Sequence, residues 1–99
     1  MVDLSGVVGF DWDEGNSRKN AHHAVSTAEA EQVFFNAPLL ILEDEKHSHS
    51  EPRFHALGKT NDGRQLHITF TLRRVGQLVR VISARDMHRK EQVTYEQAT

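Results

Sequence analysis

The segment Val79-Arg80-Val81-Ile82-Ser83-Ala84-Arg85-Asp86-Met87, residues 79–87, decides how we expect this chain to fold. Its β-branched residues predict a strand, in which Arg80 lies on the opposite face from the two valines beside it. Ser83-x-x-Asp86 is a capping-box pattern, so a helix is expected to start where the strand stops. With Arg85 and Arg89 at the same corner, this junction predicts a phosphate site. The alternative is that the arginines pair with acidic neighbours in a structural ion network.

On both sides of this segment, periodicity and capping residues define the other elements. A capping box at Ser26-x-x-Glu29 begins the better specified of two N-terminal helices, and Asp13 is expected to cap the other. The apolar run 39–42 predicts a strand that is buried on both faces. The remaining predictions are strands at 7–12, 53–59 and 66–72, helices over 14–22 and from 26 to 36, a polar loop at 43–51, a turn at 61–63 and a final helix over 84–97.

This order of elements predicts a single α+β domain over residues 1–99. The sheet is expected to be antiparallel, with the two N-terminal helices packed on it and a C-terminal helix at the end of the chain. The sheet face that carries Arg80 is expected to remain partly open, which makes it the place for a ligand. The final helix lacks a wide apolar stripe, so we expect it to pack lightly or to meet a partner.

Charge is distributed unevenly along the chain. Residues 1–51 hold ten acidic and three basic side chains, whereas residues 52–99 hold four acidic and nine basic ones. Such asymmetry indicates a polyanion or a charged protein as partner. The chain has no cysteine, which excludes disulfide scaffolds and Cys-based zinc fingers. Neither a membrane span nor a signal peptide is visible, so a cytoplasmic location is expected.

A set of motifs in fixed order resembles the BrnT family of toxins. The motifs are Phe10-Asp-Trp-Asp-Glu-Gly-Asn16, Ser26-x-x-Glu-Ala-Glu-Gln-Val-Phe-Phe-Asn36, Asp44-Glu-Lys-His-Ser48, Glu51-x-Arg53-Phe, Leu57-Gly-Lys-Thr-Asn61, Gly63-Arg64 and Val79–Met87 with its extension to Tyr95. The resemblance implies a RelE-like fold and an endoribonuclease that halts translation. It also implies a ribbon-helix-helix antitoxin, BrnA, whose dimer would carry two toxins and make the contacts with operator DNA. In the bend between the first two helices, His22 and Ala24 stand where the family usually has lysine and glycine.

RNA cleavage of this kind requires a base for the 2′-hydroxyl proton, cations for the phosphate and an acid for the leaving oxygen, but no metal or other cofactor. Arginines suit the phosphate role because their fork matches its oxygens. The candidate catalytic residues are Arg53, Arg80, Arg85 and Glu51, and the candidate RNA-binding residues are His22, His23, Arg64 and Arg89. The base is expected to be Glu51 or a histidine, His23 or His47, and Glu51 is more readily explained as the ion-pair partner of Arg53 or Arg80.

Two alternatives stay open from the sequence. His47-x-His49-x-Glu51, with acidic residues beside it, can be interpreted as a metal site if the segment is extended. The chain can also be a catalytically weakened homologue that only binds an antitoxin, which the polar last helix and the residues His22 and Ala24 favour.

Overall fold

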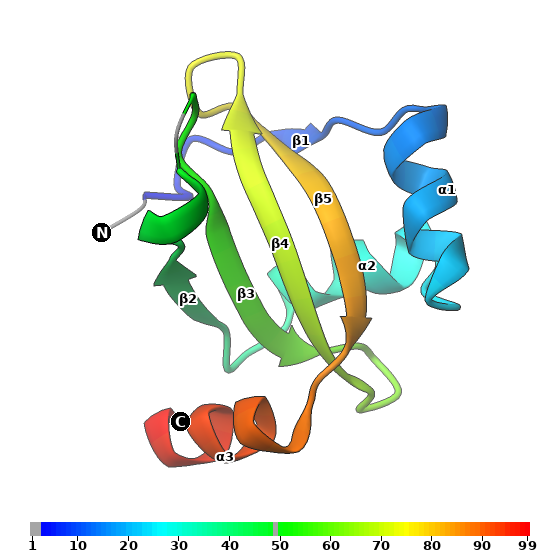
Figure 1. Cartoon of the computed structure of the whole chain (residues 1–99), viewed down its shortest axis with the longest axis vertical. Helices are drawn as coiled ribbons and strands as arrows, with labels where there is room; N and C mark the ends of the chain where they lie inside the picture. The colour runs from blue at the N-terminus through cyan, green and yellow to red at the C-terminus, as the bar shows by residue number, and fades with distance from the viewer. Residues whose placement is uncertain (1–2, 49) are drawn as a thin grey trace.

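The fold is a five-stranded sheet with three helices around it, seen in a computed structural model that describes residues 3–48 and 50–99 (Figure 1). The strands are β1 (Gly9–Phe10), β2 (Leu40–Glu43), β3 (Phe54–Lys59), β4 (Gln65–Arg73) and β5 (Leu78–Asp86), in the spatial order β1-β5-β4-β3-β2. The strands β2 to β5 form the antiparallel meander that was expected. The expectation of a wholly antiparallel sheet is wrong at β1, which pairs in parallel with β5, so the sheet is mixed.

Two of the helices agree closely with their predicted bounds. Helix α1 spans Glu14–His22 and is capped by Asp13, and helix α2 spans Thr27–Phe35. The capping box of α2 is the predicted one, because the Glu29 N–H donates to the Ser26 hydroxyl and the Ser26 N–H donates to the Glu29 carboxylate. Each cap uses partners only three residues apart, which is why these helix starts are readable from the sequence.

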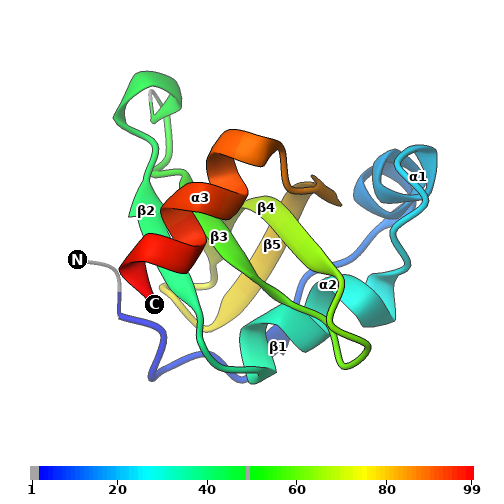
Figure 2. The same ribbon diagram turned by 90° about the horizontal axis from the view of Figure 1, so that it is seen from below.

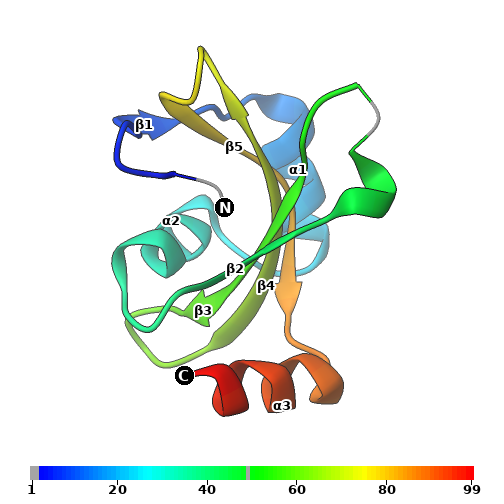
Figure 3. The same cartoon turned by 90° about the vertical axis from the view of Figure 1, so that its left-hand side faces the viewer.

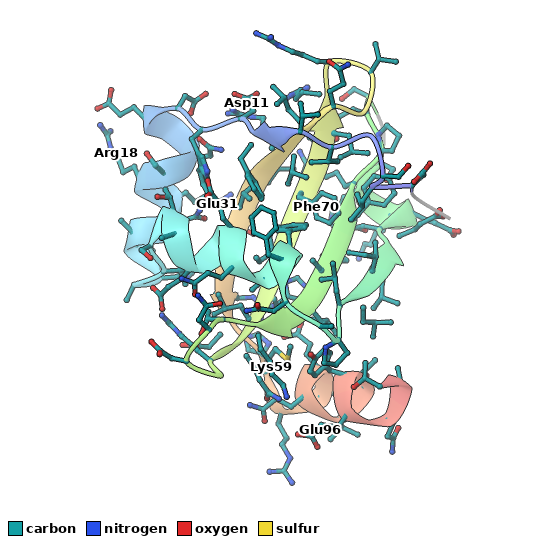
Figure 4. All side chains as sticks on the ribbon, turned by 180° about the vertical axis from the view of Figure 1, so that it is seen from behind. Asp11, Arg18, Glu31, Lys59, Phe70 and Glu96 are labelled. Carbon is teal, nitrogen blue, oxygen red and sulfur yellow. The ribbon has the colours of Figure 1, made fainter. Side chains whose placement is uncertain are left out.

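The hydrophobic core lies between α2 and one face of the sheet (Figure 3). Ala30 and Val33 of α2 pack over buried strand residues such as Ile68 and Phe70, and Figure 4 shows Phe70 lying beneath this helix. Helix α1 does not pack on this face and stands beside β5 instead (Figures 1 and 2). There the Asn16 side chain donates to the Val81 carbonyl at 2.9 Å, beyond the point where β1 ends.

The expected helix start at Ser83 is wrong. Strand β5 continues through Ser83 to Asp86, and four of its residues pair with β4 after a register shift near Ile82. Helix α3 (Arg89–Ala98) begins later, where the His88 N–H donates to the Glu91 carboxylate. Continued ladder hydrogen bonds with β4 satisfy several backbone groups, whereas a cap at Ser83 would satisfy only one or two.

Strand β2 and the segment after it also differ from expectation. Instead of being buried on both faces, β2 is the edge of the sheet, and its residues are half-buried or exposed. The polar segment 43–51 is not wholly a loop, because Glu45–His47 forms a 3₁₀ turn. The side chain of Asp44 caps the start of this turn. In the described part of the chain, no helix has both the length and the apolarity that crossing a bilayer would require.

Candidate nucleic-acid interface

The sheet face opposite the core is partly open, as expected, and it carries two adjoining hollows of about 260 and 300 Å³. Lys19 of α1, Arg53 and Ile82 line both of them, so we treat them as one feature. Its position follows from strand alternation, since core residues on β3, β4 and β5 leave their neighbours pointing to this side. We call this feature the polar groove and define it by Lys19, Asp44, His47, Arg53, His55 and Arg80.

The cations of the polar groove fall into two groups. Arg80 is held by two carboxylates, at 2.9 Å from Asp13 and 3.5 Å from Asp11. A backbone hydrogen bond from Asn16 and the Arg80 guanidinium lower the pKa of Asp13, so this carboxylate is ionised at neutral pH. Arg53 and Lys19 form no ion pair with any residue in the described ranges 3–48 and 50–99. They are therefore the groove cations whose charge is available to a ligand.

A buried carboxylate organises the other end of the groove. Asp44 is only 9% exposed and accepts a hydrogen bond from the His47 imidazole at 3.0 Å, and Nε2 of His55 lies 3.0 Å from the same carboxylate oxygen. The second ring nitrogen of His55 lies 3.1 Å from the Thr69 hydroxyl. Burial raises the pKa of Asp44, but hydrogen bonds from the side chain and backbone of His47 outweigh it, and the pKa lies below its ordinary value. Asp44 is thus an ionised carboxylate with two histidine partners.

The structure brings together three of the four predicted catalytic residues. Arg53, Arg80 and Glu51 line the same hollow. The expected ion-pair partner of Glu51 is wrong, however, because Glu51 pairs with Arg73 rather than with Arg53 or Arg80. Arg85 lies elsewhere, at the other end of β5, where it makes two hydrogen bonds of 2.8 Å to Glu91.

The predicted phosphate site at the strand–helix junction is therefore not formed. Arg80 and Arg85 lie at opposite ends of β5, and Arg89 is an exposed residue at the start of α3. Arg80 and Arg85 both pair with acidic side chains, which agrees with the alternative prediction of a structural ion network. In a strand of nine residues, the two arginines are too far apart to surround one phosphate.

The predicted RNA-binding residues lie outside the polar groove. Arg64 donates to Asp86, Glu29 and the Ala24 carbonyl, and its hydrogen bonds to Asp86 raise its pKa above the ordinary arginine value. His22 and His23 are exposed at the end of α1, with ring centroids 5.4 Å apart. The role of His22 and His23 in RNA binding stays a prediction. The guanidinium donors of Arg64, by contrast, are already used in hydrogen bonds within the protein.

Lys19, Asp44, His55 and Arg73 were missed by sequence reasoning. A signal existed for His55, because it alternates with Phe54 and Ala56 and must therefore face away from the core. Nothing local marks Lys19, which reaches the groove only because α1 stands beside β5. The interpretation of His47-x-His49-x-Glu51 as a metal site includes His49, which lies outside the described residues. Among the described residues, no group of three or more potential ligands comes together.

Comparison with known proteins gives one family. A family model described as the ribonuclease toxin BrnT of type II toxin–antitoxin systems matches residues 12–91. The matched range contains every residue that defines the polar groove. A comparison with curated proteins finds no match.

Proposed function

This chain belongs to the BrnT family of ribonuclease toxins of type II toxin–antitoxin systems, and from this we propose that it is an active endoribonuclease whose catalytic site is the polar groove. The observation that carries the proposal is that Arg53 and Lys19 remain without an acidic partner among the described residues, while Arg73 and Arg80 beside them are neutralised. Cleavage of RNA in the cytoplasm would then inhibit translation, as in the toxins that the chain resembles.

The chemistry of the groove suits metal-independent cleavage. Arg53 offers a planar fork of donors that matches two phosphate oxygens and stays charged at any physiological pH. Lys19 adds a second, mobile cation. Asp44 contacts two histidines, and Glu51, which lines one of the hollows, pairs with Arg73, so cations and imidazoles are what the groove offers to a phosphodiester. Preorganised cations of this kind stabilise the charge that develops on a pentacoordinate phosphate.

The residues that depart from the family pattern lie outside the groove. His22 and Ala24 occupy the end of α1 and the bend after it, and neither lines the hollows. This supports an active enzyme over a homologue that only binds an antitoxin. Expression of the chain without antitoxin in bacteria separates the two, because an active toxin stops growth and an inactive one does not.

The polar groove can be tested by RNA affinity and its salt dependence. A single-stranded RNA with 2′-O-methyl groups, which cannot be cleaved, is titrated by fluorescence anisotropy between about 50 and 200 mM KCl. Two phosphate-binding cations predict a slope of log K against log salt of about −1.4 for single strands. Arg53→Ala should weaken affinity about tenfold or more, since a charge-assisted hydrogen bond contributes roughly 1.5–3 kcal/mol. It should also reduce the slope by about 0.7.

Arg18→Ala is the matched control for this experiment. Arg18 lies on the same helix as Lys19 but on its outer side, paired with Glu14 (Figure 4). Its removal should leave the affinity within about twofold. A wild-type slope steeper than about −4, or an equal effect of Arg18→Ala and Arg53→Ala, would show that RNA binds elsewhere.

The partner follows from the same family. We propose that a ribbon-helix-helix antitoxin of the BrnA type neutralises this toxin and denies RNA access to the polar groove. Two toxins would then flank one antitoxin dimer, and the antitoxin would make the contacts with operator DNA. The net charge of −2 supports this division, because the whole chain is not attracted to a DNA duplex.

A further inference from the structure

The cluster around Asp44 has an arrangement that the binding of phosphate does not need. The carboxylate is buried, and it accepts from the His47 backbone N–H at 3.2 Å as well as from the His47 ring at 3.0 Å. The 3₁₀ turn Glu45–His47 therefore places the His47 ring by two separate contacts to one carboxylate. The His47 side chain is more than half exposed and lines the same hollow as Arg53 and Lys19.

The hydrogen bonds of the cluster determine which nitrogen of His47 carries the proton. An ionised carboxylate only accepts, so each imidazole nitrogen that faces Asp44 must carry a hydrogen. For neutral His47 this is Nδ1, which leaves the lone pair on Nε2. Nε2 of His47 makes no hydrogen bond within the described ranges, and the side chain is exposed and lines the groove, so this lone pair is free to accept a proton.

We propose that His47 is the general base of the RNA cleavage and that Asp44 is the positioning residue that holds its tautomer and ring, an inference that rests on the proposed ribonuclease function. Nε2 of His47 takes the proton of the ribose 2′-hydroxyl. The 2′-oxygen forms a bond to phosphorus, and the bond from phosphorus to the 5′-oxygen breaks. The leaving 5′-oxygen takes a proton from water, and the proton on Nε2 of His47 neutralises the hydroxide that this leaves, so His47 is regenerated. The products are a 2′,3′-cyclic phosphate and a 5′-hydroxyl.

The other candidate bases are less suitable on geometric grounds. Both ring nitrogens of His55 are occupied, one by Asp44 and one by Thr69. Glu51 is held in an ion pair with Arg73, so its carboxylate is already engaged. His23 is exposed at the end of α1 and does not line the groove. Among these candidates, only His47 has a ring that is held in place by a carboxylate and a second ring nitrogen without a hydrogen bond in the described residues.

Single-turnover cleavage at saturating toxin separates the base from RNA binding. His47→Ala should lower the cleavage rate about a hundredfold or more, because general base catalysis contributes about 10²–10⁴. The affinity for the 2′-O-methyl RNA should stay within about twofold of the wild type. Added imidazole should restore part of the rate of His47→Ala, since it supplies the missing base. Lys46→Ala, an exposed neighbour in the same turn, is the control that should cleave at the wild-type rate.

Asp44→Asn tests the positioning role, with circular dichroism to verify the fold. It should lower the rate about tenfold or more without weakening RNA binding, and imidazole should not restore the rate. Two-dimensional ¹H–¹⁵N spectra of the histidine rings provide a readout without activity. They should show His47 as the Nδ1–H tautomer in the wild type and a mixture in Asp44→Asn.

The outcomes distinguish this inference from the proposed function. Cleavage by His47→Ala at the wild-type rate, or an Nε2–H tautomer of His47 in the wild type, would overturn the assignment while leaving the ribonuclease function intact. A purified wild-type protein that cleaves no RNA would overturn both.

Discussion

At the scale of single residues, Ala24 is one of the non-glycine residues whose backbone has a positive φ. It has φ +56° in the bend between α1 and α2, where the N–H of Val25 donates to the Asn20 carbonyl at 3.1 Å. The Ala24 carbonyl accepts a hydrogen bond of 2.9 Å from Arg64. A left-handed residue after a helix is usually glycine, which has no Cβ to clash with the backbone. The bend is therefore maintained at the expense of about 1–2 kcal/mol of strain.

Ala24→Gly should stabilise the protein. Glycine removes the strain but adds backbone freedom to the unfolded chain, so the net gain in unfolding free energy is about 0.5–1 kcal/mol. For a domain of this size, the melting temperature should rise by about 3–6 °C. Thermal unfolding followed by circular dichroism measures it. Ala21→Gly, inside α1, should have the opposite sign because glycine weakens a helix. A loss of stability in Ala24→Gly would show that the positive φ is not strained.

At the scale of elements, helix α3 shows how a polar helix is held without an apolar stripe. Tyr95 is its buried residue, and the Tyr95 hydroxyl donates to the Pro38 carbonyl at 2.6 Å. Burial raises the pKa of Glu91, but hydrogen bonds from Arg85 and His88 outweigh it and lower the pKa to about 2. Beneath this ion pair lies His67, 9% exposed and 3.5 Å from Glu91. The helix is thus attached to the sheet by one aromatic ring and one ion pair.

His67 makes the stability of the protein depend on pH. Burial lowers the pKa of His67 to about 4, although Glu91 acts in the opposite direction. Between pH 4 and the ordinary histidine pKa of about 6.5, the unfolded chain binds a proton that the folded chain does not. Stability therefore falls as the pH falls through this window, by an amount on the order of 2 kcal/mol between pH 7 and 5 for this group.

Urea unfolding at pH 7 and pH 5 measures this effect. His67→Gln removes the titrating group, so its loss of stability between the two pH values should be smaller than that of the wild type by on the order of 2 kcal/mol. His22→Gln removes an exposed histidine and should behave like the wild type. Equal losses in wild type and His67→Gln would mean that His67 is protonated in the folded protein at pH 5.

At the scale of the whole molecule, the charge asymmetry of the sequence is largely cancelled by folding. Acidic side chains from the first half pair with arginines from the second, as in the pairs Asp13–Arg80, Glu51–Arg73 and Glu29–Arg64. The arginines of the second half therefore do not make the sheet face broadly basic. What remains on that face is a local positive charge from Arg53 and Lys19, set among neutralised arginines. An antitoxin that inhibits the toxin therefore needs to cover only the small surface around Arg53 and Lys19.

The small size of this surface leads to a prediction about the complex of toxin and antitoxin. Light scattering on the toxin co-purified with its antitoxin should give the mass of two toxins and two antitoxins, and the complex should not bind the 2′-O-methyl RNA. Toxin alone should bind operator DNA at least tenfold more weakly than the complex does, because the chain carries a net charge of −2. Tight operator binding by the toxin alone, or RNA binding by the intact complex, would contradict the arrangement.

Local patterns in the sequence were sufficient for much of the fold. The starts of α1 and α2, the turn after β3 and the alternation of β4 depend on residues within a few positions of one another. The ordered motifs also pointed to the family that the comparison found. Of the residues that line the hollows, Arg80 was identified from the period-two pattern of its strand, whereas Arg53 and Glu51 belong to a motif that resembles the family.

Only the tertiary structure decided where β5 ends and which residues meet in the groove. The cap predicted at Ser83 depends on residues three positions apart, but pairing with β4 extends the strand to Asp86, and this pairing depends on the sheet register. Asp44, His55 and Thr69 meet for the same reason, because register aligns positions from separate strands and loops. Such contacts are set by the packing of the whole sheet, which no short stretch of sequence encodes.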